Sequence, residues 1–429
     1  MNVEEHVDIV RRVLEEDIID YLSVSHGSAQ NGHKIIGAMH EPIGYELPCS
    51  REITRLTSLP TIVTGRFVTL EEADRVIAAG DADLVGMTRA HIADPDLVRK
   101  TIEGRAAEVR PCVACNQGCV GGLTRGRVGC AVNPAAGRER TASEERLERV
   151  ATPHRVLVVG GGAAGMEAAR IAALRGHEVT LAEAGERLGG MLSVARLAPH
   201  HESIGAIADW LEREIVRLGV RVLRGTRVTG QRLGEFAPDA VILATGATSV
   251  TDGRIAARPE HVTEGIDQAH VISVAALLAG AHRVGGSTAL VLDDVGRYEA
   301  IGATELLVEH DVDVTLVTPY DVFAPEMVAI GVARPALERL TASGRFRLVT
   351  GGFVKRIGAG DAVLGSLGAW PDLTVPASTV VWVGRGRPNE ALVADAARLG
   401  IPTIRVGDAE TSTGLPTAIA SGHDAGRRV

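Results

Sequence analysis

The spacing of apolar residues along the chain predicts a regular succession of helices and strands. Residues 7–16 repeat apolar positions at helical spacing, which indicates an amphipathic helix. Strand-like and helical segments then alternate, at residues 21–25, 48–58, 61–64, 70–79 and 83–89. The three strands of this series end in loops that contain glycine. The pattern predicts parallel strands joined by helical crossovers.

Two further strand–turn–helix–strand patterns follow in the rest of the chain. The first has a strand at 155–159, a helix at 166–175 and a strand at 178–182. The second has its strands at 289–292 and 312–317 and its helix at 300–308. Both patterns predict nucleotide-binding folds of the parallel α/β type.

Composition and charge narrow the range of functions. The chain of 429 residues has a net charge of −9, and aromatic residues make up 3% of it. Nucleic acid and anionic membranes are therefore not expected as partners. No apolar run approaches the ~20 residues that cross a bilayer, and the first residues do not resemble a signal peptide. Together with an unpaired Cys49, these features predict a cytoplasmic protein.

Four of the five cysteines lie close together, at Cys112, Cys115, Cys119 and Cys130. Three thiolates on one tight loop, with a fourth returning after several glycines, can hold the corners of an iron–sulfur cubane. Thiolates also bind zinc, but a zinc site more usually has two Cys-x-x-Cys pairs or a histidine ligand. Plain buried thiols are the third alternative. The spacing favours a [4Fe–4S] cluster as the metal site.

A glycine-rich turn opens the first nucleotide-type fold. Gly160 suits the tight turn, Gly162 the close approach of a pyrophosphate, and Gly165 the packing of helix on strand. Glu183 ends the second strand, where a carboxylate can accept hydrogen bonds from ribose hydroxyls. These residues predict a dinucleotide-type site, and by themselves they leave FAD, NAD and ADP open.

Arg66, Gly86, Thr88 and Arg89 lie at the ends of the last two strands of the N-terminal segment. In a (β/α)₈ barrel, the loops after strands seven and eight often form a phosphate site from backbone N–H groups and a cation. The alternative is that Arg66 and Arg89 are surface arginines at strand ends.

The run from Val85 to Pro95, followed by Arg110, Pro111 and the cysteines, resembles the old yellow enzyme branch with appended iron–sulfur and FAD-type domains. This branch includes 2,4-dienoyl-CoA reductase, trimethylamine dehydrogenase and related N-demethylases. The resemblance implies that the arginine and glycine loops of the N-terminal segment hold an FMN phosphate. It also implies an FAD or ADP site to which further residues contribute, namely Arg187, Gly190, Met191, Thr245, Gly246, Gly407 and Asp408.

The expected fold class is α/β. It combines the last three strands of a (β/α)₈ barrel, an iron–sulfur segment, and an FAD-type Rossmann-like domain with an inserted second nucleotide-type domain. The expected boundaries are 1–107 for the partial barrel, 108–150 for the [4Fe–4S] segment and linker, 151–285 with 385–429 for the FAD/ADP domain, and 286–384 for the inserted domain. Residues 382–389 resemble the strand that returns to the FAD-type domain.

Members of this branch have a whole barrel, whereas this sequence matches its last three strands. Three strands do not close a barrel, and an open parallel edge tends to pair with other strands. A second polypeptide that supplies the first five strands and shares the FMN site is therefore expected. His26 and Ser28 lie in the first loop and are catalytic candidates, although a loop histidine is more often a solvated surface residue. Amine dehydrogenases have an acidic residue where this chain has Ser28, which counts against amine oxidation.

The turn of the inserted domain lacks the glycine fingerprint, because residues 293–302 begin with two aspartates and include Arg297 and Tyr298. Crowding and like charge would oppose a pyrophosphate there. The resemblance then implies electron export to another protein, such as an electron-transfer flavoprotein. The leading hypothesis is one subunit of a flavin- and [4Fe–4S]-dependent oxidoreductase. The alternatives are an electron-transfer subunit without its own substrate site, an NAD(P)H-dependent enone or dienoyl-CoA-type reductase, and a degenerate scaffold.

Overall fold

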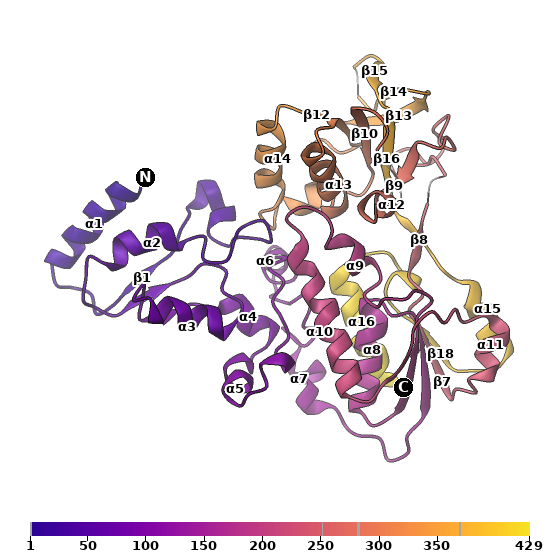
Figure 1. Cartoon of the computed structure of the whole chain (residues 1–429), viewed down its shortest axis with the longest axis horizontal. Coiled ribbons are helices and arrows are strands. Elements are labelled where there is room, and N and C mark those ends of the chain that lie inside the picture. The colour runs from indigo at the N-terminus through magenta and orange to yellow at the C-terminus, as the bar shows by residue number, and fades with distance from the viewer. Residues whose placement is uncertain (1, 251, 281–283, 369) are drawn as a thin grey trace.

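The computed structural model describes residues 2–250, 252–280, 284–368 and 370–429. Its N-terminal part extends to one side, and two α/β bodies lie one above the other on the other side (Figure 1). The cysteine segment runs between the N-terminal part and these two bodies. The predicted α/β fold, with a partial barrel and two nucleotide-type domains, is confirmed.

The N-terminal part is a three-stranded parallel sheet in the order β1-β2-β3. Its strands are β1 (Leu22–Val24), β2 (Thr61–Val63) and β3 (Leu84–Val85). Its helices are α1 (Val3–Glu15), α2 (Leu47–Thr54), α3 (Leu70–Ala78), α4 (Thr88–Ala93) and α5 (Leu97–Ile102). Helix α1 begins earlier than the apolar pattern indicates, because Asn2 and Glu5 form a capping box that supports its first turn.

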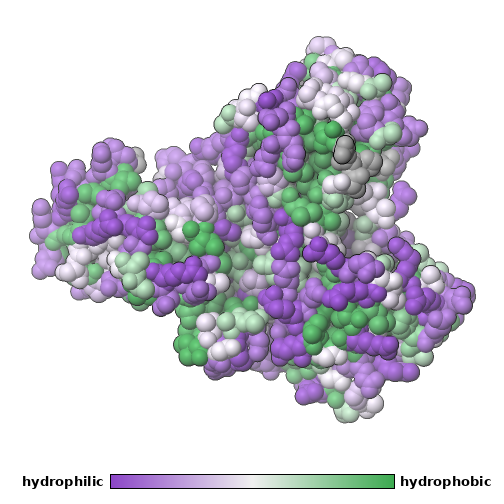
Figure 2. Space-filling model, in the orientation of Figure 1, coloured by the Kyte–Doolittle hydropathy of each residue, from purple (hydrophilic) through white to green (hydrophobic). Residues whose placement is uncertain are grey.

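The three-stranded sheet is open at both edges, since β1 and β3 each have one hydrogen-bonded neighbour within the described residues. Apolar side chains remain exposed there, including Tyr21 at 57% and Leu84 at 51%. In Figure 2, patches of apolar residues lie among polar ones on the visible face of this part. The sheet therefore has the backbone groups and the apolar surface to pair with further strands.

The cysteine segment has little regular structure, with short helices α6 (Val120–Leu123) and α7 (Glu139–Ala142). Next comes the FAD-type domain, whose parallel sheet has the order β18-β7-β4-β5-β6. Its strands are β4 (Arg155–Val159), β5 (Glu178–Ala182), β6 (Arg221–Leu223), β7 (Ala240–Leu243) and β18 (Thr403–Arg405). Its helices are α8 (Ala163–Leu174), α9 (Met191–Ala195), α10 (Gly205–Arg217), α11 (Gly230–Glu235), α15 (Ala391–Arg398) and α16 (Leu415–Arg428).

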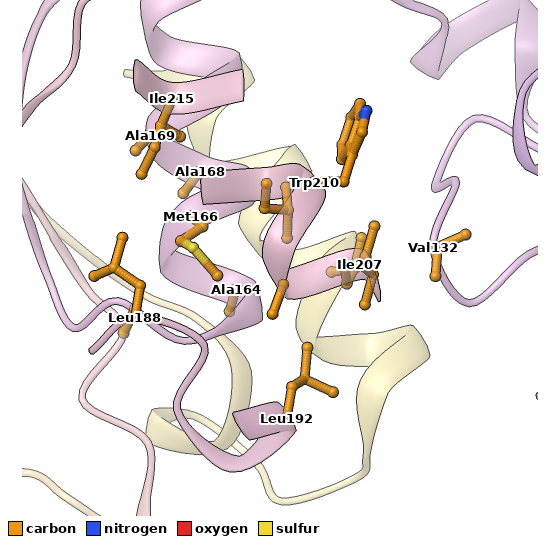
Figure 3. Packing of buried hydrophobic residues seen from close by; sticks show 14 of the residues in the cluster. Val132, Ala164, Met166, Ala168, Ala169, Leu188, Leu192, Ile207, Trp210 and Ile215 are labelled. Atoms are coloured by element: carbon orange, nitrogen blue, oxygen red, sulfur yellow. The ribbon is translucent and has the colours of Figure 1, made fainter. Parts of the chain in front are cut away.

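Helix α8 is central to the FAD-type domain because α10 and α16 both pack on it. A Cβ on Gly422 of α16 would come within 2.2 Å of the Ala164 carbonyl, so only glycine permits this approach of the two helices. Met166 of α8 and Ile207 and Trp210 of α10 are buried in the same core (Figure 3). Val132 of the cysteine segment belongs to this core too, which attaches that segment to the domain.

The inserted domain has a parallel sheet in the order β12-β11-β10-β16-β9 and a small antiparallel sheet in the order β13-β14-β15. The parallel strands are β9 (Val271–Ser273), β10 (Thr288–Asp293), β11 (Asp313–Val317), β12 (Phe346–Val349) and β16 (Thr379–Val383). The antiparallel strands are β13 (Gly352–Ile357), β14 (Asp361–Ser366) and β15 (Leu373–Pro376), and the helices are α12 (Val274–Leu278), α13 (Tyr298–Glu309) and α14 (Ala333–Ala342).

Two expectations about the inserted domain need correction. Strand β9 pairs with β16, so the domain includes residues before the expected boundary at 286. Trp382 and Val383 belong to β16 and pair with β10, and they are not part of a strand of the FAD-type domain. The chain returns through β17 (Gly386–Pro388), which pairs antiparallel with β8 (Ala247–Ser249). Short-range sequence pattern does not specify which sheet a strand joins. Among the described residues, no helix has the length and apolarity to span a bilayer.

A buried ionic cluster fixes the cysteine segment on the FAD-type domain. Arg110 donates to the Val132 carbonyl and to Glu144, both at 2.7 Å. Arg170 of α8 also donates to Glu144, at 2.7 Å, and pairs with Glu167. Both guanidinium groups lie over the ring of Trp210, at 4.6 and 5.2 Å from its centre.

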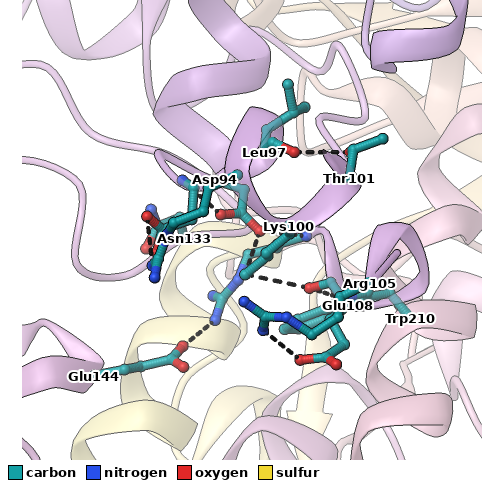
Figure 4. A network of polar contacts seen from close by, with 12 residues as sticks. Asp94, Leu97, Lys100, Thr101, Arg105, Glu108, Asn133, Glu144 and Trp210 are labelled. Carbon is teal, nitrogen blue, oxygen red and sulfur yellow. Dashed lines mark hydrogen bonds and ion pairs between the residues drawn. The ribbon is translucent and has the colours of Figure 1, made fainter. Parts of the chain in front are cut away.

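Neighbouring polar contacts extend the attachment to the N-terminal part (Figure 4). Asp94 at the end of α4 accepts from Lys100 and from the backbone N–H of Arg110. Asn133 donates to the Ile92 carbonyl of α4. The indole N–H of Trp210 donates to the Glu108 carbonyl at 3.2 Å. The cysteine segment is thus held from both sides.

Substitution of Glu167 tests the strength of this cluster. Burial alone would raise the pKa of Glu167, but Arg170 and Arg110 hold that pKa below its ordinary value. Glu167→Gln should therefore lower the free energy of unfolding by about 3 kcal/mol at pH 7, because two buried cations lose a partner. Below about pH 4 the difference from the wild type should shrink, since the contribution of a carboxylate with a lowered pKa is lost as the pH falls.

Urea unfolding at several pH values measures this difference. Glu52→Gln is the matched control, because Glu52 lies in an exposed pair with Arg55 and the change should cost less than about 1 kcal/mol. If Glu167→Gln and Glu52→Gln lowered the free energy of unfolding equally at pH 7, the buried cluster would contribute no more stability than an exposed ion pair.

Candidate cofactor sites

The four clustered cysteines line one small cavity of about 20 Å³ between α4 and the cysteine segment. None of them forms a disulfide. Ala114 and Asn116 have positive φ angles of 52° and 58°, which turns the loop tightly around the cavity. Backbone N–H groups point at the sulfurs: that of Ala114 toward Cys112, that of Gln117 toward Cys115, and those of Val132 and Asn133 toward Cys130.

These residues fit an iron–sulfur cluster. Backbone N–H groups directed at the sulfurs favour thiolates, and hydrogen bonds of this kind help to set cluster potentials. With protein atoms alone, burial raises the pKa of the Cys112 and Cys115 thiols, and that of Cys130 to about 11. Among the described residues, no group of three or more His, Cys, Asp or Glu side chains is arranged to hold a single metal ion. Ligands of a cubane bind separate irons, so their sulfurs need not meet at one point.

Asn116, inside the cysteine loop, joins the parts of the molecule. Its side chain is 1% exposed. Its carbonyl oxygen accepts from Arg89 Nη1 at 2.6 Å. Its amide group donates to the Ile36 carbonyl at 2.9 Å and to the Ile330 carbonyl of the inserted domain at 3.1 Å. Asparagine suits this position because it tolerates the left-handed backbone while offering both a donor and an acceptor.

The predicted FMN-phosphate residues gather beside this loop. Arg89 lines the cysteine cavity and also donates to the Gly37 carbonyl at 2.7 Å. Burial and the nearby charge of Arg89 lower the pKa of Arg66. Arg66 donates to the Glu41 carbonyl, but its buried Nε has no hydrogen-bond partner, and its φ of 64° is unusual for arginine. Two adjacent guanidinium groups with an unpaired buried donor fit an anion such as a phosphate.

Gly86 and Thr88 belong to the same corner of the sheet. The Gly86 N–H donates to the Val63 carbonyl at 2.8 Å, and a Cβ on Gly86 would lie 2.9 Å from the Thr64 side chain. Thr88 is the first residue of α4. These four residues follow the ends of β2 and β3, and their role in binding FMN stays a prediction.

The glycine turn of the FAD-type domain has the form of a phosphate cradle. A Cβ on Gly160 would come within 2.2 Å of the Ala244 carbonyl, and one on Gly165 within 1.9 Å of the Gly160 carbonyl. A Cβ on Gly162 would meet no atom within 4 Å, so Gly162 faces open space at the N-terminus of α8. Backbone N–H groups and the helix dipole there suit a pyrophosphate.

Glu183 lies over this turn. Its two carboxylate oxygens accept from the N–H groups of Gly161 and Gly185, each at 2.7 Å. Each oxygen retains a lone pair that could accept from a ribose hydroxyl. The turn, the open space and the carboxylate together fit an FAD or ADP.

The other predicted residues of this site lie on neighbouring loops. Gly190 lies against Gly162, and Gly407 lies against Ala164 at the start of α8. Thr245 donates to the Asn389 carbonyl, and Gly246 has a φ of 68°. Arg187 and Met191 are exposed, and Asp408 is half-buried. Contact of each residue with a cofactor stays a prediction.

In the inserted domain, an aspartate takes the place of a phosphate at the turn after β10. Asp293 Oδ1 accepts from the N–H groups of Val295 and Gly296, at 3.0 and 2.8 Å. In a dinucleotide-binding turn, such N–H groups would face the pyrophosphate. Asp293 is fully buried and its Oδ2 has no hydrogen-bond partner. The turn is thus occupied by the protein's own carboxylate.

The two catalytic candidates do not converge on a site within the described residues. Ser28 is exposed, and its hydroxyl lies within hydrogen-bond distance of two acceptors, the side-chain oxygens of Gln30 and Asn31. His26 is half-buried, and its backbone N–H donates to Glu46 at 2.9 Å. The catalytic residue therefore stays unassigned.

Two family models match the chain in succession. Residues 3–108 match the NADH:flavin oxidoreductase / NADH oxidase family, and residues 129–235 match the pyridine nucleotide-disulphide oxidoreductase family. The chain belongs to the flavin oxidoreductases that join these two families.

Relatives in this family carry different names. The chain is 39% identical to "NADH oxidase" of Thermoanaerobacter brockii over 244 residues, which are 56% of this chain and 37% of that protein. It is 33% identical to "Probable N-methylproline demethylase" of Rhizobium meliloti over 335 residues, which are 76% of this chain and 47% of that protein. The chain therefore spans less than half the length of these two relatives.

One solved structure superposes closely on this chain. This is 6-hydroxypseudooxynicotine amine oxidase from Pseudomonas geniculata N1, with a TM-score of 0.90 and 26% identity. The match covers 97% of this chain and 63% of that one. The predicted resemblance to the flavin oxidoreductases is thereby confirmed.

Two residues that hold the cysteine loop, Asn116 and Tyr298, were not predicted from the sequence. Asn116 lies within the cysteine motif but carries no signal of its own, because its partners are distant backbone carbonyls. Tyr298 was considered only as bulk that replaces a glycine, whereas its hydroxyl donates to the Cys115 carbonyl at 2.9 Å. The hydroxyl of a buried tyrosine usually has a hydrogen-bond partner, so the sequence alone could have indicated that Tyr298 has one.

Replacement of Asp293 tests the role of its carboxylate at the turn. Burial raises the pKa of Asp293 to about 6. A raised pKa means that folding favours the protonated form, so the contribution of Asp293 to stability should fall as the pH rises from about 4 to 6 and stay level above. Asp293→Asn keeps an acceptor without the charge, so it should raise stability at pH 8 by about 2 kcal/mol, with the gain vanishing near pH 4.

Thermal or urea unfolding across this pH range measures the effect. Asp321→Asn, at an exposed position in the same domain, is the control and should change little. A loss of stability in Asp293→Asn at every pH would show that the charge itself holds the turn.

Proposed function

We propose that the chain is part of a flavin- and [4Fe–4S]-dependent oxidoreductase in which electrons pass between an FMN, the cluster and an FAD-type cofactor. The observation that carries this proposal is the position of the cysteine cavity. Arg89 both lines the cavity and lies beside Arg66 at the FMN-phosphate corner, while Val132 packs into the core of the FAD-type domain. A cluster held there would exchange single electrons, and flavins connect such transfers to two-electron chemistry.

The protein's own residues would position these groups. Cys112, Cys115, Cys119 and Cys130 would hold the cluster, and the glycine turn with Glu183 would hold FAD or ADP. Arg66 and Arg89 would hold the FMN phosphate and balance its negative charge. Asn116 fixes the cysteine loop to Arg89, and the Arg110–Glu144 pair fixes the start of the cysteine segment to its end.

Direct use of NAD(P)H is not favoured by the inserted domain. Its turn N–H groups are already bonded to Asp293, and Asp294 adds a second buried carboxylate beside it. Binding of a pyrophosphate would require loss of these hydrogen bonds and would place like charges together. We therefore assign the chain to substrate oxidation with export of electrons to a protein acceptor such as an electron-transfer flavoprotein.

The name of the Rhizobium meliloti relative, a demethylase, supports an oxidised substrate, and the name of the Thermoanaerobacter brockii relative supports the alternative of NADH oxidation. Stopped-flow mixing with NADH or NADPH distinguishes substrate oxidation with electron export from oxidation of the nicotinamide nucleotide. The proposal expects flavin bleaching that is slow compared with bleaching by dithionite. Fast bleaching by either nucleotide would support an NAD(P)H-dependent reductase.

A matched pair of cysteine variants tests the cluster. Cys119→Ser should lose most of its iron and acid-labile sulfide after anaerobic purification, because serine is a poor ligand for this cluster. Cys49→Ser, on α2 and outside the cavity, should keep both. Chemical iron and sulfide assays give the result. Equal iron in the two variants, or an iron-free wild type, would refute the cluster proposal.

The open edges of the N-terminal sheet support the further proposal that another polypeptide segment completes the barrel. The exposed side chains at β1 and β3, such as Tyr21 and Leu84, would be covered by its strands. Tagged protein isolated from its native host should therefore carry a second polypeptide together with FMN. Isolation of this chain alone, stable and with full FMN occupancy, would disprove a shared barrel.

A further inference from the structure

Three consecutive residues of the inserted domain, Arg297, Tyr298 and Glu299, reach from the FAD-type site to the cysteine loop. They stand where a dinucleotide-binding domain would have its glycine turn, and Tyr298 is the first residue of α13. The Tyr298 hydroxyl donates to the carbonyl of Cys115 at 2.9 Å. Cys115 is the most buried of the clustered cysteines and lines the cavity. The hydrogen bond therefore ends on a residue that would be a cluster ligand.

The residues on either side of Tyr298 face the other cofactor site. Burial raises the pKa of Asp408, and the neighbouring charge of Arg297 acts against that rise. Burial likewise raises the pKa of Glu299, and the charge of Asp408 adds to the rise. Asp408 thus lies close to both residues, across the junction between the FAD-type and inserted domains.

The Tyr298 ring is held in a fixed orientation. The ring of His201 packs edge-on against it, with 5.0 Å between the ring centres. Tyr298 packs against the cores of both the FAD-type and the inserted domains. A tyrosine hydroxyl is a hydrogen-bond donor at neutral pH, so it can hold the Cys115 carbonyl oxygen. Gly302, one turn further along α13, lets the segment that contains His201 approach closely, because a Cβ there would come within 2.7 Å of the Ala198 side chain.

We propose that Tyr298 is a positioning residue that holds the Cys115 carbonyl and thereby raises the reduction potential of the [4Fe–4S] cluster. The inference rests on the proposed function, because it presupposes the cluster. The positive end of the O–H dipole points at the cysteine loop, so it stabilises the extra negative charge of the reduced state. Without the hydroxyl, the negative end of the carbonyl dipole would remain uncompensated in a buried place. The turn of the inserted domain does not suit a dinucleotide, and through Tyr298 it would raise the reduction potential of the cluster.

The test uses the full chain, purified anaerobically with any polypeptide that accompanies it, and a redox titration followed by electron paramagnetic resonance. Tyr298→Phe keeps the ring and removes the hydroxyl, so the midpoint potential of the cluster should fall. Tyr320→Phe is the matched control, since Tyr320 lies in the same domain and its hydroxyl also donates to a backbone carbonyl, that of Asp294. The control should leave the potential and the spectrum of the cluster unchanged.

A second substitution of Tyr298 keeps the test decisive if Tyr298→Phe loses its cluster. Replacement of Tyr298 by 3-fluorotyrosine retains the shape and makes the hydroxyl a stronger donor, so the potential should rise. An unchanged potential in either Tyr298 variant with full iron content, or an equal shift in Tyr320→Phe, would overturn the inference while leaving the proposed function intact. A wild-type protein without iron would overturn both.

Discussion

The structure depends on a tight loop of cysteines, of which Cys115 is buried, and this loop must be held from several sides at once. Four sulfurs in one cavity cannot be placed by a loop that is free to move, and the short helices around them supply little rigidity. Asn116 provides much of the constraint, because its amide is bonded to Arg89, to the Ile36 carbonyl and to the Ile330 carbonyl of the inserted domain. Each bond joins the loop to a different segment, so loop geometry and domain arrangement are coupled.

The ionic cluster around Trp210 acts on the other side of the same segment. Arg110 and Arg170 share Glu144, and Glu167 and His423 continue the network into α16. Although burial by itself would raise the pKa of Glu144, Arg170 and Arg110 hold it at about 2, so this carboxylate stays charged. Arg110, Arg170 and Glu167 are buried, so removal of one partner would leave an uncompensated buried charge, and the pairing fixes how the segment docks. The cysteine segment is therefore a structural junction as well as a candidate redox site.

The sequence specified local features well and the contacts between domains poorly. The cysteine spacing and the glycine turn were legible because each follows from short-range geometry, and the structure brings Cys112 with Cys130 and Gly160 with Gly165 as expected. The corner formed by Arg66 and Arg89 was predictable because parallel strands end at one edge of a sheet. The roles of Asn116 and Tyr298, and the place of β9 in the inserted domain, depend on partners far away in the chain, for which an apolar pattern carries no signal.

We propose that the four cysteines hold an iron–sulfur cluster between two flavin-type sites. The most direct measurement is the Mössbauer spectrum of anaerobically purified, iron-57-enriched protein before and after reduction by dithionite. A [4Fe–4S] cluster predicts about four iron atoms per chain in one mixed-valence site that gains an electron on reduction. Protein that holds zinc, isolated ferric iron or no metal in the same preparation would contradict the account.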